Sequence, residues 1–252
     1  MCGICGCSSN ELHHDTNHSH NHHHELNQVL IEQDILAANN ALAVSNRNYL
    51  QQQNILTFNV MSSPGAGKTT LLTKTIADLK NTLPFYVIVG DQQTDHDAKR
   101  FTELNIPARQ INTGKSCHLD AHSIHHALDE FNLPSSSILF IENVGNLVCP
   151  ALFDLGEAYK IIILSVTEGT DKPLKYPYMF HHADAVILSK IDLLPYVDFD
   201  LKQCCEFIKQ INPKTQIISV STKTEENLVN WYQWLKETWD TQEHAAKNTN
   251  TN

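Results

Sequence analysis

A glycine-rich segment at residues 62–70, SSPGAGKTT, has the residue types needed to hold a chain of phosphates. It matches the pattern G-x-x-x-x-G-K-[ST] except at its first position, which is Ser62. Glycines let backbone N–H groups approach phosphate oxygens at the start of a helix, while lysine neutralises phosphate charge and threonine binds Mg²⁺. An ordinary glycine-rich turn is the alternative. The predicted nucleotide-binding residues here are Gly65, Ala66, Gly67, Lys68, Thr69 and Thr70.

Acidic residues lie at or just beyond the ends of two apolar runs that would end near this segment. Glu142 and Gly145 occur in ENVG, at a place where GTPases have D-x-x-G. Asp91 and Asp97 follow the apolar run 85–90 and predict a first switch segment. A carboxylate at a strand end can hold Mg²⁺, and the glycine N–H can contact a γ-phosphate. The predicted Mg²⁺ ligands are Thr69, Asp91, Asp97 and Glu142, and the predicted catalytic residues are Lys68, Thr69, Asp97 and Glu142.

The segment Ser189-Lys190-Ile191-Asp192 resembles the N-K-x-D motif that recognises guanine. The Asp192 carboxylate could accept hydrogen bonds from guanine N1 and N2, which adenine cannot match. Ser189 replaces the usual asparagine, and a plain strand end is the alternative interpretation. Ser221, at the end of the last apolar run, falls where a loop would back the base. We therefore predict guanine rather than adenine, with Lys190, Asp192 and Ser221 as contacts.

Two loops of the chain carry soft metal ligands. Cys117 and His118 lie at the start of an expected helix, and Cys149 lies four residues beyond Gly145. Two thiolates and an imidazole suit Zn²⁺ or Ni²⁺. His122, one turn beyond His118, is a further candidate for this ion or for a second one. Buried structural cysteines are the alternative for 117 and 149.

The first 24 residues form a second candidate metal site. Three cysteines stand in Cys-x-x-Cys-x-Cys spacing, and seven of the 15 histidines follow within the same stretch. The polar composition predicts a mobile tail, and its thiolates and imidazoles predict a chelating arm. A tag-like or neutral run is the alternative for the histidines, and a redox motif for the cysteines. The predicted metal ligands of the tail are Cys2, Cys5 and Cys7.

The elements that would position these residues alternate between strand and helix. Apolar runs that lack polar alternation predict buried parallel strands at 55–61, 85–90, 138–143, 160–166, 185–190 and 216–221. Helical patterns are expected at 69–81, 95–104, 119–131, 201–210 and 225–239. The fold class is therefore α/β, with a mostly parallel sheet flanked by helices over residues 54–241. One helix, or two broken near Asn39-Asn40, is expected over 25–53, and a polar tail over 242–252.

Composition excludes several classes of protein. With 18 Lys and Arg against 28 Asp and Glu, the net charge is -10, which disfavours nucleic-acid and anionic-membrane partners. No apolar run approaches the roughly 20 residues of a membrane span, and no signal-peptide pattern is visible. We therefore expect a cytoplasmic protein, whose seven cysteines are thiols or metal ligands.

Together these motifs resemble the HypB family, GTPases that help to insert nickel into [NiFe]-hydrogenase. The resemblance covers about residues 55–240 and the first seven, and Ser62 and Ser189 depart from the family pattern. It implies a P-loop NTPase fold that hydrolyses GTP with Mg²⁺. The matching segments are MCGICGC, the His-rich tail, SSPGAGKTT, GDQQTDHDAKR, NTGKSCHLDAH, FIENVGNLVCPALFDLGE, SVTEGTDKPLKYPYMF and SKIDLLPY.

The resemblance also implies metal sites and partners. It carries a high-affinity nickel site over to Cys2, Cys5 and Cys7, and a domain site for Ni²⁺ or Zn²⁺ over to Cys117, His118 and Cys149. A GTP-linked homodimer, a HypA-like metallochaperone and the hydrogenase large-subunit precursor are the implied partners. The alternatives are a urease-type accessory GTPase, a nickel or zinc store with vestigial GTPase activity, and a P-loop kinase.

One hypothesis joins the two chemistries. Gly145, expected at the γ-phosphate, is four residues from Cys149, expected at the metal. Loss of γ-phosphate contacts releases switch loops of this kind, so nucleotide state is predicted to move Cys149 relative to Cys117 and His118. No glutamine or arginine finger can be assigned from the sequence, and slow intrinsic turnover is expected.

Overall fold

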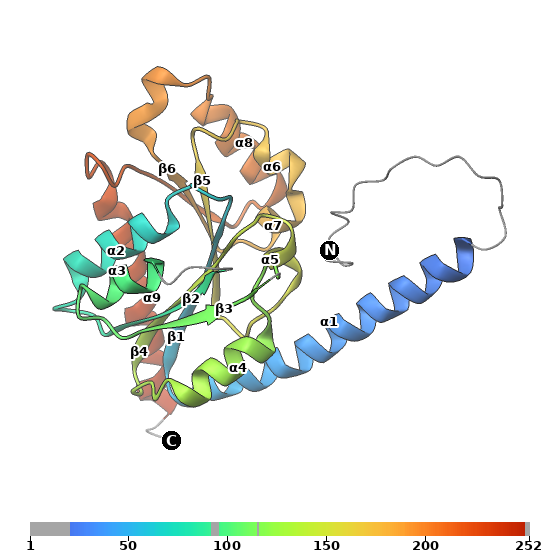
Figure 1. The fold of residues 1–252 in the computed structure, drawn as a ribbon. Helices are drawn as coiled ribbons and strands as arrows, with labels where there is room; N and C mark the ends of the chain where they lie inside the picture. Colours follow the sequence, from blue (N-terminus) through green and yellow to red (C-terminus); the bar gives the residue numbers. More distant parts are fainter. Residues whose placement is uncertain (1–20, 92–95, 115, 250–252) are drawn as a thin grey trace.

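A computed structural model describes residues 21–91, 96–114 and 116–249. It contains one seven-stranded sheet in the order β3-β2-β4-β1-β5-β6-β7, with every neighbouring pair parallel (Figure 1). The predicted tail ligands Cys2, Cys5 and Cys7 lie outside the described residues. The strands are β1 (Ile55–Ser62), β2 (Phe85–Asp91), β3 (Ala108–Asn112), β4 (Ser137–Gly145), β5 (Tyr159–Ser165), β6 (Ala185–Ser189) and β7 (Gln216–Val220).

Helices lie on both faces of this sheet, as parallel strands require (Figure 1). The predicted α/β architecture is confirmed, and six of the seven strands fall on the apolar runs. The helices are α1 (Asn21–Gln52), α2 (Lys68–Leu79), α3 (His96–Thr102), α4 (Ala121–Glu130), α5 (Cys149–Leu152), α6 (Lys172–Lys175), α7 (Pro177–His181), the 3₁₀ helix η1 (Ile191–Tyr196), α8 (Leu201–Ile211) and α9 (Leu228–Thr249).

The strand order places a topological switch at the centre of the sheet. From β1 the chain goes outward through β2 to β3, returns to β4 beside β1, and then continues on the other side through β5. Ligands of open α/β sheets bind outside the carboxyl ends of the strands at such a switch. The carboxyl ends of β1 and β4 carry the glycine-rich segment and the ENVG segment, so the topology brings the two together.

Helix α1 is one continuous helix, without a break at Asn39-Asn40. Asn39 is buried, where its Nδ2 donates to the Asp154 carbonyl at 2.8 Å and its Oδ1 accepts from the Ala121 amide at 2.8 Å. Asn46, two turns further along the same helix face, donates to the carbonyls of Ala121 and Leu155. These polar residues stay helical because they satisfy backbone groups at the start of α4 and before β5.

Helices run across the predicted boundaries at residues 24 and 242. Helix α1 begins at Asn21, and α9 continues to Thr249. Contacts with the turn before β1 explain the length of α9: Asn54 Nδ2 donates to Glu243 Oε1 at 2.5 Å, and Gln242 Nε2 donates to Asn54 Oδ1 at 3.3 Å. The polar composition of this segment reflects an exposed helix rather than a frayed tail.

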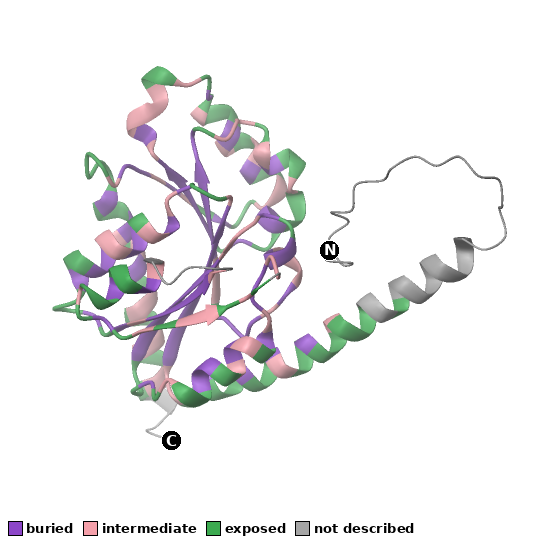
Figure 2. Ribbon diagram, viewed as in Figure 1, coloured by how far each residue is buried: buried purple, intermediate pink, exposed green. Residues whose placement is uncertain are grey.

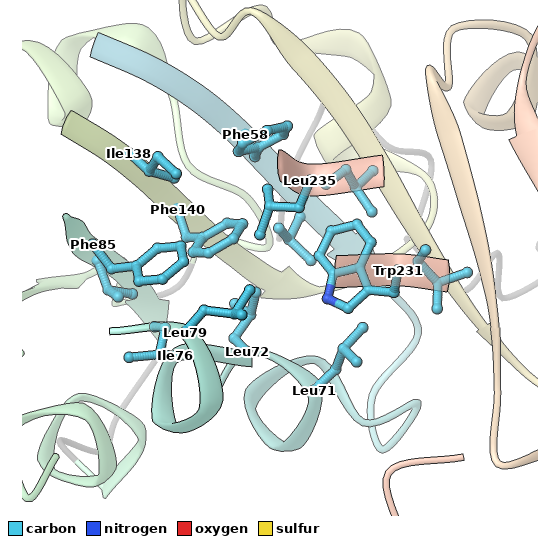
Figure 3. Close-up of a cluster of buried hydrophobic side chains, with 14 of the residues drawn as sticks. Phe58, Leu71, Leu72, Ile76, Leu79, Phe85, Ile138, Phe140, Trp231 and Leu235 are labelled. Atoms are coloured by element: carbon cyan, nitrogen blue, oxygen red, sulfur yellow. The ribbon is translucent and has the colours of Figure 1, made fainter. Parts of the chain in front are cut away.

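The largest hydrophobic core lies between the sheet and helices α2, α3 and α9 (Figure 2). Phe58 and Phe140 project from the adjacent strands β1 and β4 into this core, and Trp231 projects into it from α9 (Figure 3). The Trp231 indole Nε1 donates to Thr75 Oγ1 of α2 at 2.8 Å. This core fixes α2 on the sheet with its first turn at the carboxyl edge.

The opposite face of the sheet carries two smaller cores. One packs against α1 and α4, and the other against α7 and α8. Cys204 is fully buried in the second of these, and Cys205 packs against it. Among the described residues, none of the helices is both long and apolar enough to cross a membrane.

Candidate functional site

The segment 62–70 forms a tight turn between β1 and α2. Gly65 and Gly67 both have left-handed backbone conformations, with φ of 74° and 101°. Gly67 directly precedes α2, so the first N–H groups of that helix face the turn. Two side chains from the end of β6 hold the turn: Lys190 Nζ donates to the Gly65 carbonyl and Ser189 Oγ to the Ala66 carbonyl, each at 2.7 Å. Ser189, which stands where the motif has asparagine, therefore forms a hydrogen bond to the turn at residues 62–70.

Ser62 replaces the first glycine of the pattern without strain. It is the last residue of β1 and is fully buried. Its hydroxyl donates to the Ser63 carbonyl at 2.6 Å and accepts from Lys68 Nζ at 2.9 Å. Burial lowers the pKa of Lys68, while the nearby Glu142 carboxylate opposes this shift. The hydroxyl therefore helps to hold the lysine that would meet phosphate.

Glu142 lies on β4 directly beside the start of α2. Thr69 Oγ1 donates to Glu142 Oε1 at 2.5 Å. The carboxyl group is nearly fully buried, which raises its pKa to about 7. Its Oε2 is buried and makes no hydrogen bond to the described residues. An unsatisfied carboxylate oxygen next to a threonine hydroxyl is a donor set that fits Mg²⁺.

A cavity of about 480 Å³ lies between the phosphate turn, α3 and the end of β4. Asp91 and Asp97 line it together with Arg100, which the sequence reasoning did not select. Arg100 Nη1 lies 3.9 Å from Asp97 Oδ1, one helical turn away. Most of the predicted phosphate and Mg²⁺ residues line this cavity: Gly65, Gly67, Lys68, Thr69, Thr70, Asp91, Asp97, Glu142, Gly145 and Lys190.

Gly145 ends β4 in close contact with the phosphate turn. A Cβ atom at this position would lie 3.0 Å from Pro64 Cα, so a larger residue would push the two segments apart. The close approach explains why this position is glycine, and Gly145 lines the cavity. This arrangement fits the predicted contact of Gly145 with a γ-phosphate.

The predicted base contacts lie together beyond β6 and β7. Ser221 Oγ donates to Asp192 Oδ1 at 2.6 Å, so the two residues from separate loops are joined. Asp192 is half-buried in η1, directly after Lys190, whose φ of 61° is left-handed. This hydrogen bond fixes the orientation of the carboxylate that the sequence predicts for guanine.

Cys117, His118 and Cys149 form one cluster at the same edge of the sheet, with their ligand atoms all within 4.8 Å of one another. The two Sγ atoms are 2.7 Å apart, and Cys117 Sγ lies 3.8 Å from His118 Nδ1. Two thiolates on one Zn²⁺, with Zn–S of about 2.3 Å, would lie about 3.8 Å apart. Binding of an ion would therefore increase the distance between the two sulfur atoms by about 1 Å.

The surroundings of the imidazole in this cluster favour its neutral form. His118 stacks on Phe153 at a ring distance of 3.9 Å, and its burial lowers its pKa. Asn146 Nδ2 donates to Cys149 Sγ at 3.5 Å. Neutral imidazole and thiolate are the forms that bind borderline divalent ions.

The predicted start of the helix at Cys117 and His118 was wrong. Cys117 and His118 precede α4 rather than starting it, because Asp120 caps that helix by accepting from the Ser123 amide at 2.7 Å. His122 therefore does not share a helix face with His118, and it is exposed. It does not belong to the cluster of Cys117, His118 and Cys149.

Asn143 links the phosphate side of the site to the metal side, and the sequence reasoning missed it. Its Oδ1 accepts from the amide of Val144, beside Gly145, at 2.9 Å and from the amide of Leu119, beside His118, at 3.2 Å. Its Nδ2 donates to Asn59 Oδ1 at 3.2 Å. A buried amide side chain between an acidic residue and a glycine, in an otherwise apolar strand, was the available signal.

Comparison with known proteins places these features in a family. The model of the CobW/HypB/UreG nucleotide-binding domain matches residues 56–219. The Hydrogenase maturation factor HypB of Azotobacter vinelandii is 54% identical over 206 residues, which is 82% of this chain and 68% of the relative. The chain belongs to the HypB family.

Two solved HypB structures agree with this fold. HypB from Archaeoglobus fulgidus has a TM-score of 0.76 and 38% identity, covering 81% of this chain and 99% of that one. HypB from Helicobacter pylori, in complex with nickel, has a TM-score of 0.76 and 41% identity, covering 81% and 96%. This chain of the HypB family therefore has a P-loop NTPase architecture and a nucleotide-binding domain.

Proposed function

We propose that this protein is a GTP-hydrolysing nickel metallochaperone, which delivers or inserts nickel during maturation of [NiFe]-hydrogenase. One observation carries the proposal: the turn at the phosphate cavity and the thiolate–imidazole cluster share the backbone from Gly145 to Cys149. The names of the HypB relatives support hydrogenase as the client. The nickel bound to the H. pylori relative supports nickel as the cargo.

The nucleotide is GTP in this proposal because of the Asp192–Ser221 pair. A carboxylate held by a hydroxyl presents an acceptor to the N1 and N2 donors of guanine. Adenine would leave that acceptor unpaired, which costs binding free energy. Lys190, fixed on the phosphate turn, joins the base loop to the triphosphate loop.

Hydrolysis transfers the γ-phosphoryl group of GTP to water and yields GDP and phosphate. Lys68 and the first N–H groups of α2 stabilise the negative charge of the transferred group. Thr69 and Glu142, with Asp91 and Asp97, would hold Mg²⁺, which neutralises phosphate charge when bound. Water is positioned by backbone groups at the end of β4, so slow intrinsic turnover is expected.

Coupling between GTP and nickel follows from Asn143 and from the shared turn. A movement of Val144 and Gly145 with the γ-phosphate acts on Asn143, which also holds the amide next to His118. The same movement acts on Cys149 along the chain. A tenfold change in nickel affinity needs about 1.4 kcal/mol of coupling free energy. Coupling is reciprocal, so nickel must change GTP affinity by the same factor.

The proposal includes three protein partners. A homodimer, whose formation depends on nucleotide or metal, would bring two metal clusters into one assembly. A HypA-like metallochaperone would exchange metal with the protein, and the hydrogenase large-subunit precursor would receive nickel. The tail residues Cys2, Cys5 and Cys7 would supply a further nickel site.

Nickel titrations in the presence of GDP and of a non-hydrolysable GTP analogue test this function. We expect the apparent Kd of the cluster to differ at least severalfold between the two states. A Cys117→Ala/Cys149→Ala variant is the control, because it keeps the tail and the nucleotide site but removes both thiolates of the cluster. Identical curves for the wild type in the two nucleotides would refute the coupling.

A further inference from the structure

The turn before β5, residues 153–157 with the sequence FDLGE, ends in a buried carboxylate that the mechanism above does not use. Glu157 is 5% exposed. Its Oε1 accepts from Lys160 Nζ at 2.6 Å and from Asn59 Nδ2 at 3.1 Å, and its Oε2 accepts from the Leu155 amide at 2.7 Å. A carboxylate has no hydrogen to donate, so Glu157 acts only as an acceptor toward these partners.

Two buried asparagines continue this arrangement toward the phosphate cavity. Asn59 of β1 turns its Nδ2 to Glu157 and its Oδ1 to Asn143 of β4. Asn143 donates its Nδ2 to that Oδ1 at 3.2 Å, which leaves its own Oδ1 to accept from the Leu119 and Val144 amides. Every hydrogen bond in this chain therefore points the same way, and Glu157 is the last acceptor.

The direction of the chain matters because an asparagine amide accepts at one end and donates at the other. If the Asn59 amide turned over, its Oδ1 would face the carboxylate of Glu157 and its Nδ2 would face the Nδ2 of Asn143. Both contacts would then be repulsive, between side chains that are buried. Lys160, the neighbour of Asn59 on β5, would favour the turned amide if Glu157 were absent, because its ammonium group would then attract the Asn59 oxygen.

We propose that Glu157 is a positioning residue that acts through Asn59 on Asn143. It holds the Asn143 carbonyl toward the amides of Leu119 and Val144, so that one side chain joins the loop at the metal cluster to the loop at the phosphate cavity. Nucleotide-dependent movement of one loop then reaches the other, whereas an Asn143 amide that was free to turn would not transmit it. This last step rests on the proposed function, but the orientation of Asn143 does not.

Amide hydrogen exchange, measured by NMR on the full-length protein without metal or nucleotide, tests the orientation of this chain. Glu157→Met removes both acceptor oxygens at a similar side-chain length, so the Leu119 amide should lose its acceptor and exchange about tenfold faster. The amide of Ile187, in the middle of β6, is the reference for global unfolding and should change less. Glu168→Met is the matched control and should leave Leu119 unchanged. Its carboxylate is also mostly buried and accepts from a backbone amide, that of Ser165 at 3.0 Å, but it is no part of the chain.

A second variant moves the carboxylate one position along the chain. In Glu157→Met/Asn59→Asp the new carboxylate can accept from both Lys160 Nζ and Asn143 Nδ2, so the orientation of Asn143 and the slow exchange of the Leu119 amide should return. A contribution of Glu157 to stability alone predicts no such rescue. The double variant decides the matter even if Glu157→Met alone does not fold.

Nickel titrations of the same variants in GDP and in a non-hydrolysable GTP analogue test the step that rests on the proposed function. The ratio of the two Kd values should fall toward one in Glu157→Met and return in the double variant. Equal Kd values in the wild type would refute the proposed coupling, and the exchange data would still decide the orientation.

Four results would each overturn the role of Glu157. They are equal acceleration at Leu119 and Ile187 in Glu157→Met, the same acceleration at Leu119 in Glu168→Met, a double variant that stays fast or does not fold, and a wild-type Kd ratio, different from one, in a Glu157→Met protein whose Leu119 amide exchanges fast.

Discussion

At the scale of single residues, Glu142 combines deep burial with the chemistry of a carboxylate. Its ionised form is stabilised by Thr69 and Lys68, but burial has the larger effect and raises its pKa to about 7. The folded chain therefore binds a proton more tightly than the unfolded chain between about pH 4.5 and pH 7. Stability must fall as pH rises through this window, since the unfolded state binds fewer protons there.

Glu142→Gln should stabilise the nucleotide-free protein at pH 8 while abolishing Mg²⁺-dependent GTP hydrolysis. The amide keeps an acceptor for Thr69 but removes the buried charge, for a gain of up to about 3 kcal/mol in the free energy of unfolding. Urea unfolding at pH 8 and pH 5 measures the gain. At pH 5 it should vanish, because Glu142 is then protonated. An equal effect at both pH values would contradict the role of ionisation.

At the scale of elements, the core beneath α2 fixes the position of the phosphate turn. Trp231 is 1% exposed, stacks on Trp234 at 5.5 Å, and donates to Thr75 in the middle of α2. The hydrogen bond to Thr75 joins α9 to α2 about two turns beyond Lys68. Stability and nucleotide binding should therefore respond differently to a change at this position.

Trp231→Phe should lower the free energy of unfolding by about 1–3 kcal/mol, because it removes a buried hydrogen bond and leaves a small cavity. GTP affinity should stay within about twofold, since the first turn of α2 is untouched. Urea unfolding and nucleotide titration measure the two effects. Trp234→Phe, at a half-buried position, is the control and should cost less. A large loss of GTP affinity would show that α9 also shapes the phosphate turn.

Elements with strong apolar patterns were predictable from the sequence, and those defined by long-range polar contacts were not. Strand β3 was not predicted because it is short and its sequence, ARQIN, is mostly polar. It forms by pairing with β2 at the edge of the sheet. The continuity of α1 depends on the hydrogen bonds of Asn39 with Asp154 and Ala121. These partners lie 115 and 82 residues further along the chain. A single-sequence pattern contains no information about such partners.

The candidate site divides in the same way. The glycine-rich turn, Glu142 and the cluster of Cys117, His118 and Cys149 follow from motifs that concentrate chemistry in a few adjacent residues. The helix face expected to be shared by His118 and His122 does not exist, because Asp120 caps α4 after His118. Asn143 was missed because its role lies in two backbone amides rather than in a ligand.

At the scale of the whole molecule, the sheet brings two ligand sites to one edge, and Asn143 is the side chain that contacts both flanking loops. Its Oδ1 accepts from amides beside Gly145 and beside His118, and Asn59 holds its Nδ2. Replacing it need not remove either ligand site, because Asn143 contributes no ligand atom to the metal cluster. It should instead break the connection between them.

Asn143→Ala should reduce the ratio of nickel Kd values in the GDP and GTP-analogue states toward one. Each ligand alone should still bind, with some loss of stability, because the buried Leu119 amide and the partly buried Val144 amide lose their acceptor, at up to about 1–3 kcal/mol each. Asn143→Asp is the matched variant, since it keeps an acceptor oxygen for both amides, and it should retain most of the coupling. Nickel titrations of the three proteins in both nucleotides measure the ratio. If the alanine variant folds and keeps the wild-type ratio, coupling runs along residues 145–149 alone, and Asn143 serves only to hold the loops.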